Sequence, residues 1–366
     1  MTEGYELYGA EASYYSGKVR AYLRYKRIPF IEYPNTPENY RKVILPRVGW
    51  PVIPVVVTPE GETLQDSTDI IDALEIRFPD APVYPATTKE RLAALLLELY
   101  GDEWLKIPAM HYRWNRNYDF AIAEFGRMNA PELTGEARRE AGLKISKPFA
   151  GALPFLGVTP RTEEAIEASY EGLLGELDRH FAVYEFLLGT RPSIGDFGLI
   201  GPLYAHLYRD PASGDLMKRV APNVARWVER MMKPPHPKGG EFLARDEVPA
   251  TLMPVLQRMM REMIPVLVST AHHLTKWVEE HPDAKNEPLP RAIGTHVFSL
   301  EGAKENRAIF PFDLWMLQRP LDYIASLEMD EKPNAAKLLA EAGGETLMDF
   351  PAFPRLTRRH FKVALA

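Results

Sequence analysis

The order of apolar and polar residues near the start of the chain predicts two strands joined by a helix. Residues 5–8 have the composition of a short strand, and Val19, Leu23 and Ile28 follow at helical spacing. A second β-prone run covers 28–33 and begins beside a proline. We therefore expect a strand–helix–strand (βαβ) unit within the first few dozen residues.

Two more strands and a helix are predicted just downstream. Val52–Val57 is strongly β-prone but contains Pro54, and proline is tolerated only at strand starts, edges or bulges. Pro54 therefore indicates a special local geometry, such as a cis peptide bond. A turn at 58–61 leads to a second hairpin strand, and the polar residues at 66–69 have the signature of a helix start. This ββα order completes a small α/β unit that ends near residue 85.

The remainder of the chain has mainly helical periodicity. A long helical stretch covers 88–116, and Ser193 with Asp196 has the spacing of a capping box, which is a helix-start signal. Further helices are predicted at 132–147, 161–187, 196–209, 215–233, 250–281, 312–329 and 334–347. Helices therefore account for most of the chain after the first α/β unit.

These elements divide the chain into three predicted parts. An α/β domain covers 1–85, an all-helical domain covers 88–233, and a mainly helical extension covers 234–366. A hairpin with arms at 295–300 and 308–310 is predicted within the extension.

The composition excludes several kinds of chemistry. The formal net charge of −6 argues against a nucleic acid or an anionic membrane surface as a partner. No residue is cysteine, so thiol chemistry would need a thiol that the substrate carries. The histidines lack carboxylates at ligand spacing, so no metal site is predicted. A secretory signal pattern is not visible and the apolar stretches are too short to span a bilayer, which fits a cytoplasmic setting.

Hydroxyl side chains gather where the first predicted loop becomes a helix. Ser13 suits the N-cap position of this helix. A helix N-terminus carries unpaired N–H groups and a partial positive charge, so it favours an anion, including a thiolate. Taken alone, the stretch is more typical of an ordinary capped helix, and a thiolate site is the alternative.

Four segments carry a resemblance to a known family. They are Ser13–Arg20 at the first strand–helix junction, Val52–Val55 at the proline, Gln65–Ile70 at a helix start, and Arg191–Phe197 at the capping box. In order and spacing they resemble the glutathione S-transferases, in particular the serine-type classes. The resemblance covers 5–233 and implies a thioredoxin-like α/β domain of βαβ–ββα order followed by an all-α domain. The remaining residues exceed the usual length of the family.

The resemblance implies how the thiol of glutathione would be held for catalysis. Ser13 aligns with the hydroxyl donor of the serine-type classes and with the cysteine of the thiol-exchange classes. Tyr14 stands where many relatives have proline, and its phenol is an alternative donor to the sulfur. A hydroxyl and a helix N-terminus together would stabilise the thiolate at neutral pH.

The same resemblance implies which residues hold the middle and the glycyl end of glutathione. Ile53 would offer its backbone N–H and C=O to the cysteinyl residue, in a turn that Pro54 supplies. Lys42, or its neighbour Arg41, would reach the glycyl carboxylate.

The γ-glutamyl end would lie at the helix start after the second hairpin. Ser67 and its backbone N–H would bind the carboxylate, and Asp66 would face the ammonium group. Gln65 belongs to the same segment and is included among the glutathione-binding residues. The alternative for this segment is a capped helix without a ligand.

A second substrate would be expected between the two domains. The stretch at 88–116 is rich in aromatic residues, and Trp104 and His111 are seven positions apart, so they share one helix face. They could line a pocket for an apolar or aromatic substrate, or they could belong to the interdomain core.

Three functions follow from the resemblance. The first is a detoxification transferase that activates glutathione, its co-substrate, for attack on a small electrophile. The second is a glutathione-dependent lyase or isomerase in catabolism. The third is a non-catalytic binding or assembly protein, which the long extension suggests. The family also implies a cytoplasmic homodimer with no nucleic-acid or membrane partner.

Overall fold

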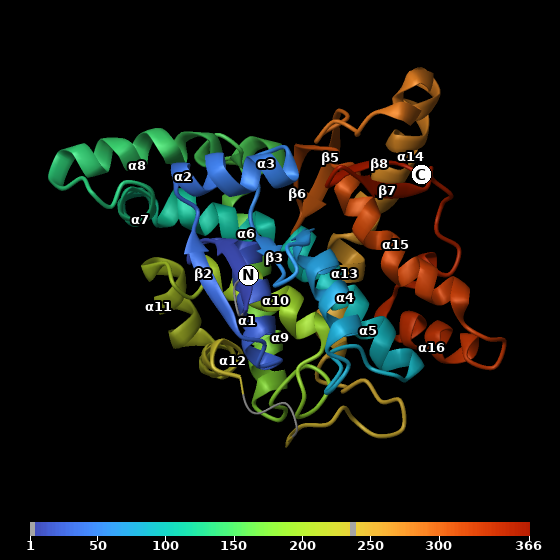
Figure 1. Cartoon of the computed structure of the whole chain (residues 1–366). Helices are drawn as coiled ribbons and strands as arrows, with labels where there is room; N and C mark the ends of the chain where they lie inside the picture. The colour runs from blue at the N-terminus through green and yellow to red at the C-terminus, as the bar shows by residue number, and fades with distance from the viewer. Residues whose placement is uncertain (1–3, 235–238) are drawn as a thin grey trace.

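A computed structural model describes residues 4–234 and 239–366 of the protein (Figure 1). It contains a four-stranded sheet made of β1 (Tyr5–Gly9), β2 (Phe30–Pro34), β3 (Val55–Val57) and β4 (Thr63–Gln65). The strand order is β2-β1-β3-β4, with β2 parallel to β1 and the other neighbours antiparallel. Helix α1 (Tyr14–Tyr25) follows β1 and α4 (Ser67–Arg77) follows β4, so the predicted thioredoxin-like order βαβ–ββα is confirmed.

The strands of this sheet bury side chains on both faces, and helices and turns cover each face. Leu7 and Val56 point into the core that contains the apolar residues of α1 and α4. Tyr8 and Val55 point into a second, smaller cluster. That cluster includes residues of α3 (Leu45–Val48), which follows the short α2 (Pro37–Asn39) and a π-helical turn. The peptide bond before Pro54 is cis, as its place in a β-prone run indicates.

The helical part of the chain, α5 to α12, lies against the sheet domain. Its helices are α5 (Thr88–Leu99), α6 (Lys106–His111), α7 (Tyr118–Asn129), α8 (Gly135–Ala150), α9 (Glu163–Phe181), α10 (Ile194–Ala205), α11 (Pro211–Val220) and α12 (Pro222–Met232). The predicted helix at 88–116 is divided by π-helical turns at Tyr100–Trp104 and Tyr112–Arg116. Helix α7 was not expected, and the helix expected at 215–233 is two helices, because Ala221-Pro222 interrupts it.

Helix α10 is buried on all sides and forms the centre of the helical part. The predicted capping box is confirmed: the backbone N–H of Ser193 donates to the Asp196 carboxylate at 2.8 Å. The same carboxylate accepts from the Trp227 indole at 3.0 Å. A Cβ added to Gly198 would lie 2.6 Å from the Cα of Glu98, so glycine is what allows α10 to approach α5.

The C-terminal part, α13 to β8, adds helices and two hairpins (Figure 1). Its elements are α13 (Met253–Glu262), α14 (Ile264–Glu280), β5 (Thr295–Leu300), β6 (Ala303–Ala308), α15 (Pro311–Ser326), α16 (Lys332–Ala342), β7 (Leu356–Arg359) and β8 (Lys362–Leu365). One expectation needs correction, and one hairpin was not expected. The first hairpin turns at Glu301-Gly302, so its second arm begins at 303 rather than 308. The hairpin β7–β8 was not predicted.

Arg319 of α15 joins the three parts of the chain. Its Nη1 atom lies 2.6 Å from the carboxylate of Asp72 in α4, and its Nε atom lies 3.4 Å from the carboxylate of Glu98 in α5. The α7–α8 pair and the C-terminal part lie on opposite sides of the sheet in Figure 1. Within the described residues, no helix has the length and apolar character needed to cross a membrane.

Candidate functional site

Strand register brings the predicted site segments to one end of the sheet. Tyr8 of β1 pairs with Val55 of β3, and Val55 pairs with Gln65 of β4. The loop that follows β1, the residues that precede β3 and the start of α4 therefore meet at the same end. The N-terminus of α1, the N-terminus of α4 and the backbone of Ile53 therefore lie at one end of the sheet.

Ser13 is the N-cap of α1 and lies at this end of the sheet. Its hydroxyl oxygen accepts from the backbone N–H of Ser16 at 3.3 Å. The loop before it is fixed because Arg113 donates to the carbonyl of Ala12 at 2.8 Å, and Arg113 is itself paired with the buried Asp210. Ser13 is therefore a partly exposed hydroxyl at a held helix N-terminus, which is the geometry that favours an anion.

The two tyrosines after Ser13 point into the helical part. The Tyr14 hydroxyl donates to the carbonyl of Gly101, and the Tyr15 hydroxyl donates to the carbonyl of Asp102 at 3.0 Å. Burial raises the pKa of Tyr14 well above its ordinary value, and Asp102 adds to the shift. The phenol of Tyr14 is thus engaged in the domain interface, which favours Ser13 over Tyr14 as the donor to a sulfur.

Ile53 presents its backbone beside this helix end. It lies just outside the pairing of β3, which begins at Val55. In the part of the chain that the structure describes, no hydrogen bond is made by its N–H or C=O. An extended ligand could therefore pair with both groups, as the cysteinyl residue of glutathione is expected to do.

Asp66 and Ser67 form the start of α4. Asp66 has φ 79°, a left-handed value that is uncommon for a residue with a side chain, and its carboxylate accepts from the N–H of Thr68 at 3.0 Å. Such strained positions occur at ligand clamps. Ser67 is 3% exposed.

A cluster of buried charged residues connects α1 and the start of α4 to the helical part. Lys18 of α1 donates to Glu98 at 2.7 Å, to Asp102 at 2.5 Å and to Thr68 at 3.0 Å. Burial opposes the charge on Lys18, but the two carboxylates outweigh it, so the pKa of Lys18 is raised. Burial raises the pKa of Asp102 to about 7 although Lys18 acts in the opposite direction. The cluster fixes α1 to α5, and sequence reasoning did not find it.

No contact in the described part of the chain joins Lys42 or Arg41 to the other predicted site residues. Both are exposed, and Lys42 pairs with Glu38 at 2.6 Å on the same turn. Their role at a glycyl carboxylate stays a prediction.

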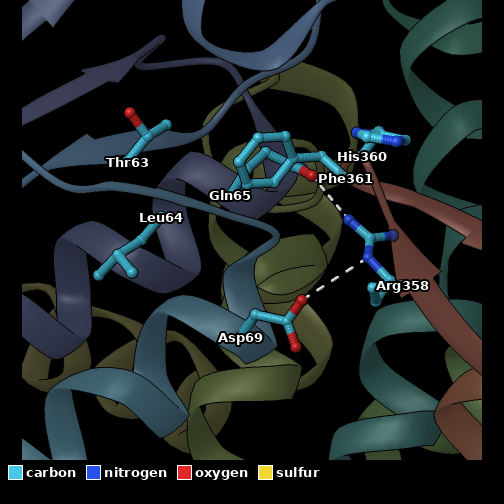
Figure 2. Close-up of a pocket in the computed structure, with 7 residues that line it drawn as sticks. All are labelled: Thr63, Leu64, Gln65, Asp69, Arg358, His360 and Phe361. Atoms are coloured by element: carbon cyan, nitrogen blue, oxygen red, sulfur yellow. Dashed lines mark hydrogen bonds and ion pairs between the residues drawn. The ribbon is translucent and has the colours of Figure 1, made fainter.

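A cavity of about 430 Å³ opens beside Gln65 (Figure 2). It is lined by Thr63, Leu64, Gln65, Asp69, Arg358, His360 and Phe361. Gln65 is buried, and its Oε1 atom accepts from Nη2 of Arg358 at 2.6 Å. Burial and the neighbouring Asp66 raise the pKa of Asp69 to about 7, although Arg358 acts against the shift. The three residues from the β7–β8 hairpin were missed from the sequence.

Trp104 and His111 belong to the core rather than to a substrate pocket. The Trp104 indole donates to Glu262 of α13 at 3.1 Å, and its ring meets Phe298 of β5 edge-on. His111 is buried against Glu167 of α9, with 2.9 Å between Nε2 and Oε1. Of the two alternatives for these residues, the structure shows the buried core, because the C-terminal part and α9 cover them. No group of three or more candidate metal ligands occurs in 4–234 or 239–366.

Two family models match the chain, and each describes one domain of the same family. Residues 7–82 match the N-terminal domain of glutathione S-transferases, and residues 157–230 match the C-terminal domain. No curated protein matches the chain in sequence.

Several solved structures are similar to part of the chain. A glutathione S-transferase from Methylobacterium radiotolerans, in complex with glutathione sulfonate, is 23% identical, covers 63% of this chain and 91% of its own, and has a TM-score of 0.42. The beta-etherase LigF from Sphingobium sp. strain SYK-6 is 18% identical, covers 64% and 97%, and has a TM-score of 0.46. Similarity this low carries no information on activity or substrate.

Proposed function

Because its two matched domains place the chain in the glutathione S-transferase family, we propose that it binds glutathione where Ser13, Ile53 and Ser67 meet at the end of the sheet. The bound thiol is activated for attack on a small electrophile. The observation that carries this proposal is the strand register, which brings two helix N-termini and an unpaired stretch of backbone to one place.

The chemistry at the sulfur follows from the start of α1. A free thiol has a pKa of about 8.5, so the site has to favour the thiolate at neutral pH. The Ser13 hydroxyl can rotate to donate to the sulfur, and the N-terminus of α1 adds a partial positive charge. Since the chain has no cysteine, the nucleophile is the thiol of glutathione itself.

The other groups of the site bind the rest of glutathione and so fix the position of its sulfur beside Ser13. Ile53 pairs with the cysteinyl backbone, and the start of α4 with Ser67 binds the carboxylate of the γ-glutamyl residue. Asp66 faces the ammonium group. A lyase or isomerase reaction would use the same thiolate as a transferase reaction. The chemical nature of the electrophile determines which of these reactions occurs.

A non-catalytic binding protein is the second candidate function. The observation that favours it is that Trp104 and His111, for which a pocket for the electrophile was one of two alternatives, are buried under other elements. In this case glutathione would bind without a second substrate beside it. The homodimer, the cytoplasmic setting and the role in detoxification stay predictions.

Titration calorimetry with glutathione, followed by turnover of an activated aryl halide, tests the proposal. We expect binding by the wild-type protein, and a loss of turnover of about 10²-fold in Ser13→Ala with little change in affinity, as for other single donors to a developing anion. Binding without turnover would support the non-catalytic function. A protein that shows no binding at all would falsify both.

A further inference from the structure

The β7–β8 hairpin forms a wall of the cavity beside Gln65, although it lies far outside both matched domains (Figure 2). Its turn consists of His360 and Phe361, both with positive φ, as in the tight two-residue turns that join antiparallel strands. Phe361 packs against the small apolar cluster of the sheet that contains Tyr8 and Val55, and Val52 and Ile53 pack against the same cluster. The tip of the hairpin and the segment that contains Ile53 therefore pack against the same cluster.

Arg358 is the charged residue that this hairpin brings to the cavity. Its Nη2 atom donates to Gln65, while its Nε atom is 3.6 Å from the carboxylate of Asp69, beyond hydrogen-bond distance. Nε is buried and makes no hydrogen bond within the described residues. The guanidinium lies over the rings of Trp315 and Phe312, at 5.2 and 5.5 Å from their centres. The aromatic rings thus hold a planar cation whose Nε–H faces Asp69 in an ion pair without a hydrogen bond.

Arg358 lies at the start of α4. It contacts Gln65, which precedes the helix, and forms an ion pair with Asp69 in the first turn. The backbone at a helix N-terminus favours negative charge, so a ligand carboxylate bound there would share the guanidinium with Asp69. Arginine binds carboxylates through parallel N–H groups, which gives direction as well as strength. A second cavity of about 330 Å³ shares Asp69 and Arg358 with the first, so the guanidinium is reachable from both.

We propose that Arg358 binds the α-carboxylate of the γ-glutamyl residue of glutathione, together with Ser67 and the N-terminus of α4, while Asp66 faces the ammonium group. This inference rests on the proposed function, and it makes the C-terminal hairpin part of the glutathione site. Arg358, which lies outside both matched domains, would then make the chain select thiols that carry this carboxylate.

The test compares glutathione with γ-aminobutyryl-cysteinyl-glycine, which lacks only that carboxylate, by titration calorimetry. We expect Arg358→Gln to weaken glutathione binding by about 10- to 100-fold, the effect of one charged hydrogen bond, and to leave the analogue unchanged. The matched control is Arg359→Gln, since Arg359 precedes the same turn and, among the described residues, donates only to the carbonyl of Lys285. This control should bind both ligands as the wild type does.

The outcomes separate this inference from the proposed function. If the wild-type protein does not bind glutathione, the proposed function fails. If it binds and Arg358→Gln binds equally well, only the assignment of Arg358 is overturned. An equal loss of affinity for both ligands overturns it too, because Arg358 would then act only by stabilising the β7–β8 hairpin. Should Arg358→Gln not fold, Arg358→Lys keeps the charge, and a partial loss restricted to glutathione is expected from it.

Discussion

Lys18 Nζ lies 2.7 Å from Glu98 Oε1, and this buried ion pair crosses from the sheet domain to the helical part. With Asp102 it forms a cluster in which one lysine faces two carboxylates. Charges this deep are tolerated only when they are paired, so the lysine and the carboxylates depend on one another.

Lys18→Met should therefore destabilise the protein by about 3–5 kcal/mol, since it leaves Asp102 buried without a counter-charge and leaves Glu98 with Arg319 alone. Urea unfolding followed by circular dichroism measures the change. Lys42→Met is the control, because Lys42 is exposed in its pair with Glu38 and its loss should stay within about 0.5 kcal/mol. Equal effects of the two substitutions would contradict the role of the buried cluster.

Ser13→Ala and Tyr14→Phe should have different effects, the first on the pKa of the bound thiol and the second on the stability of the protein. Ser13→Ala should raise the pKa of the bound glutathione thiol, which ultraviolet absorbance of the thiolate follows as pH is varied. Tyr14→Phe should leave that pKa unchanged and cost about 1–3 kcal/mol of stability, because the Gly101 carbonyl loses its buried donor. A raised thiol pKa in Tyr14→Phe alone would transfer the donor role to Tyr14.

Gly157→Ala should weaken the attachment of the C-terminal part. Gly157 has φ 75°, and an added Cβ would lie 2.1 Å from Cε1 of Phe298 in β5. Gly343 has a similar φ of 71° but nothing within 4 Å of an added Cβ. Gly343→Ala should therefore cost only about 1–2 kcal/mol for the backbone conformation, and Gly157→Ala about 1–3 kcal/mol more. Thermal unfolding of both variants checks this, and Phe298→Leu should recover part of the difference.

His180 should make the stability depend on pH. It is buried between Thr251 and the carbonyl of Phe186, and burial lowers its pKa to about 4. In the unfolded chain its pKa is about 6.5, so between pH 6.5 and 4 the unfolded state binds a proton that the folded state does not. The stability from His180 is thus complete above pH 6.5 and lost as the pH falls to 4, by about 3 kcal/mol.

Urea midpoints of the wild type and of His180→Gln from pH 7 to 4 measure this dependence. The difference in stability between the two proteins should narrow as the pH falls, because glutamine does not titrate in this range. A constant difference would show that His180 does not titrate differently in the folded and unfolded states.

Local signals in the sequence were sufficient for the sheet domain and for α10. Pro54 in a β-prone run indicated the cis bond, and Ser193 with Asp196 indicated the capping box. These features depend on neighbours within a few residues. The order of the strands and helices follows from periodicity for the same reason.

The wall of the cavity could not be predicted because its signals are not local. The β7–β8 turn is His360-Phe361, which lacks the Asn-Gly or Asp-Gly signal of tight hairpin turns. Arg358 meets Gln65 across 293 positions of sequence. In β6 the polar residues suggested a loop, but Glu305 and Arg307 point inward because Thr159 and Asp313 provide partners for them.

The ion pairs of Arg319 have a consequence for how such chains can be recombined. Asp72, Glu98 and Arg319 come from three parts of the chain and meet at one point. A hybrid protein that combined this sheet domain with the helical domain of a relative would keep Asp72 and Lys18 but lose the charges that face them. The sheet domain is therefore not an interchangeable unit, and a successful exchange would have to transfer the charged residues of α5 and α15 along with it.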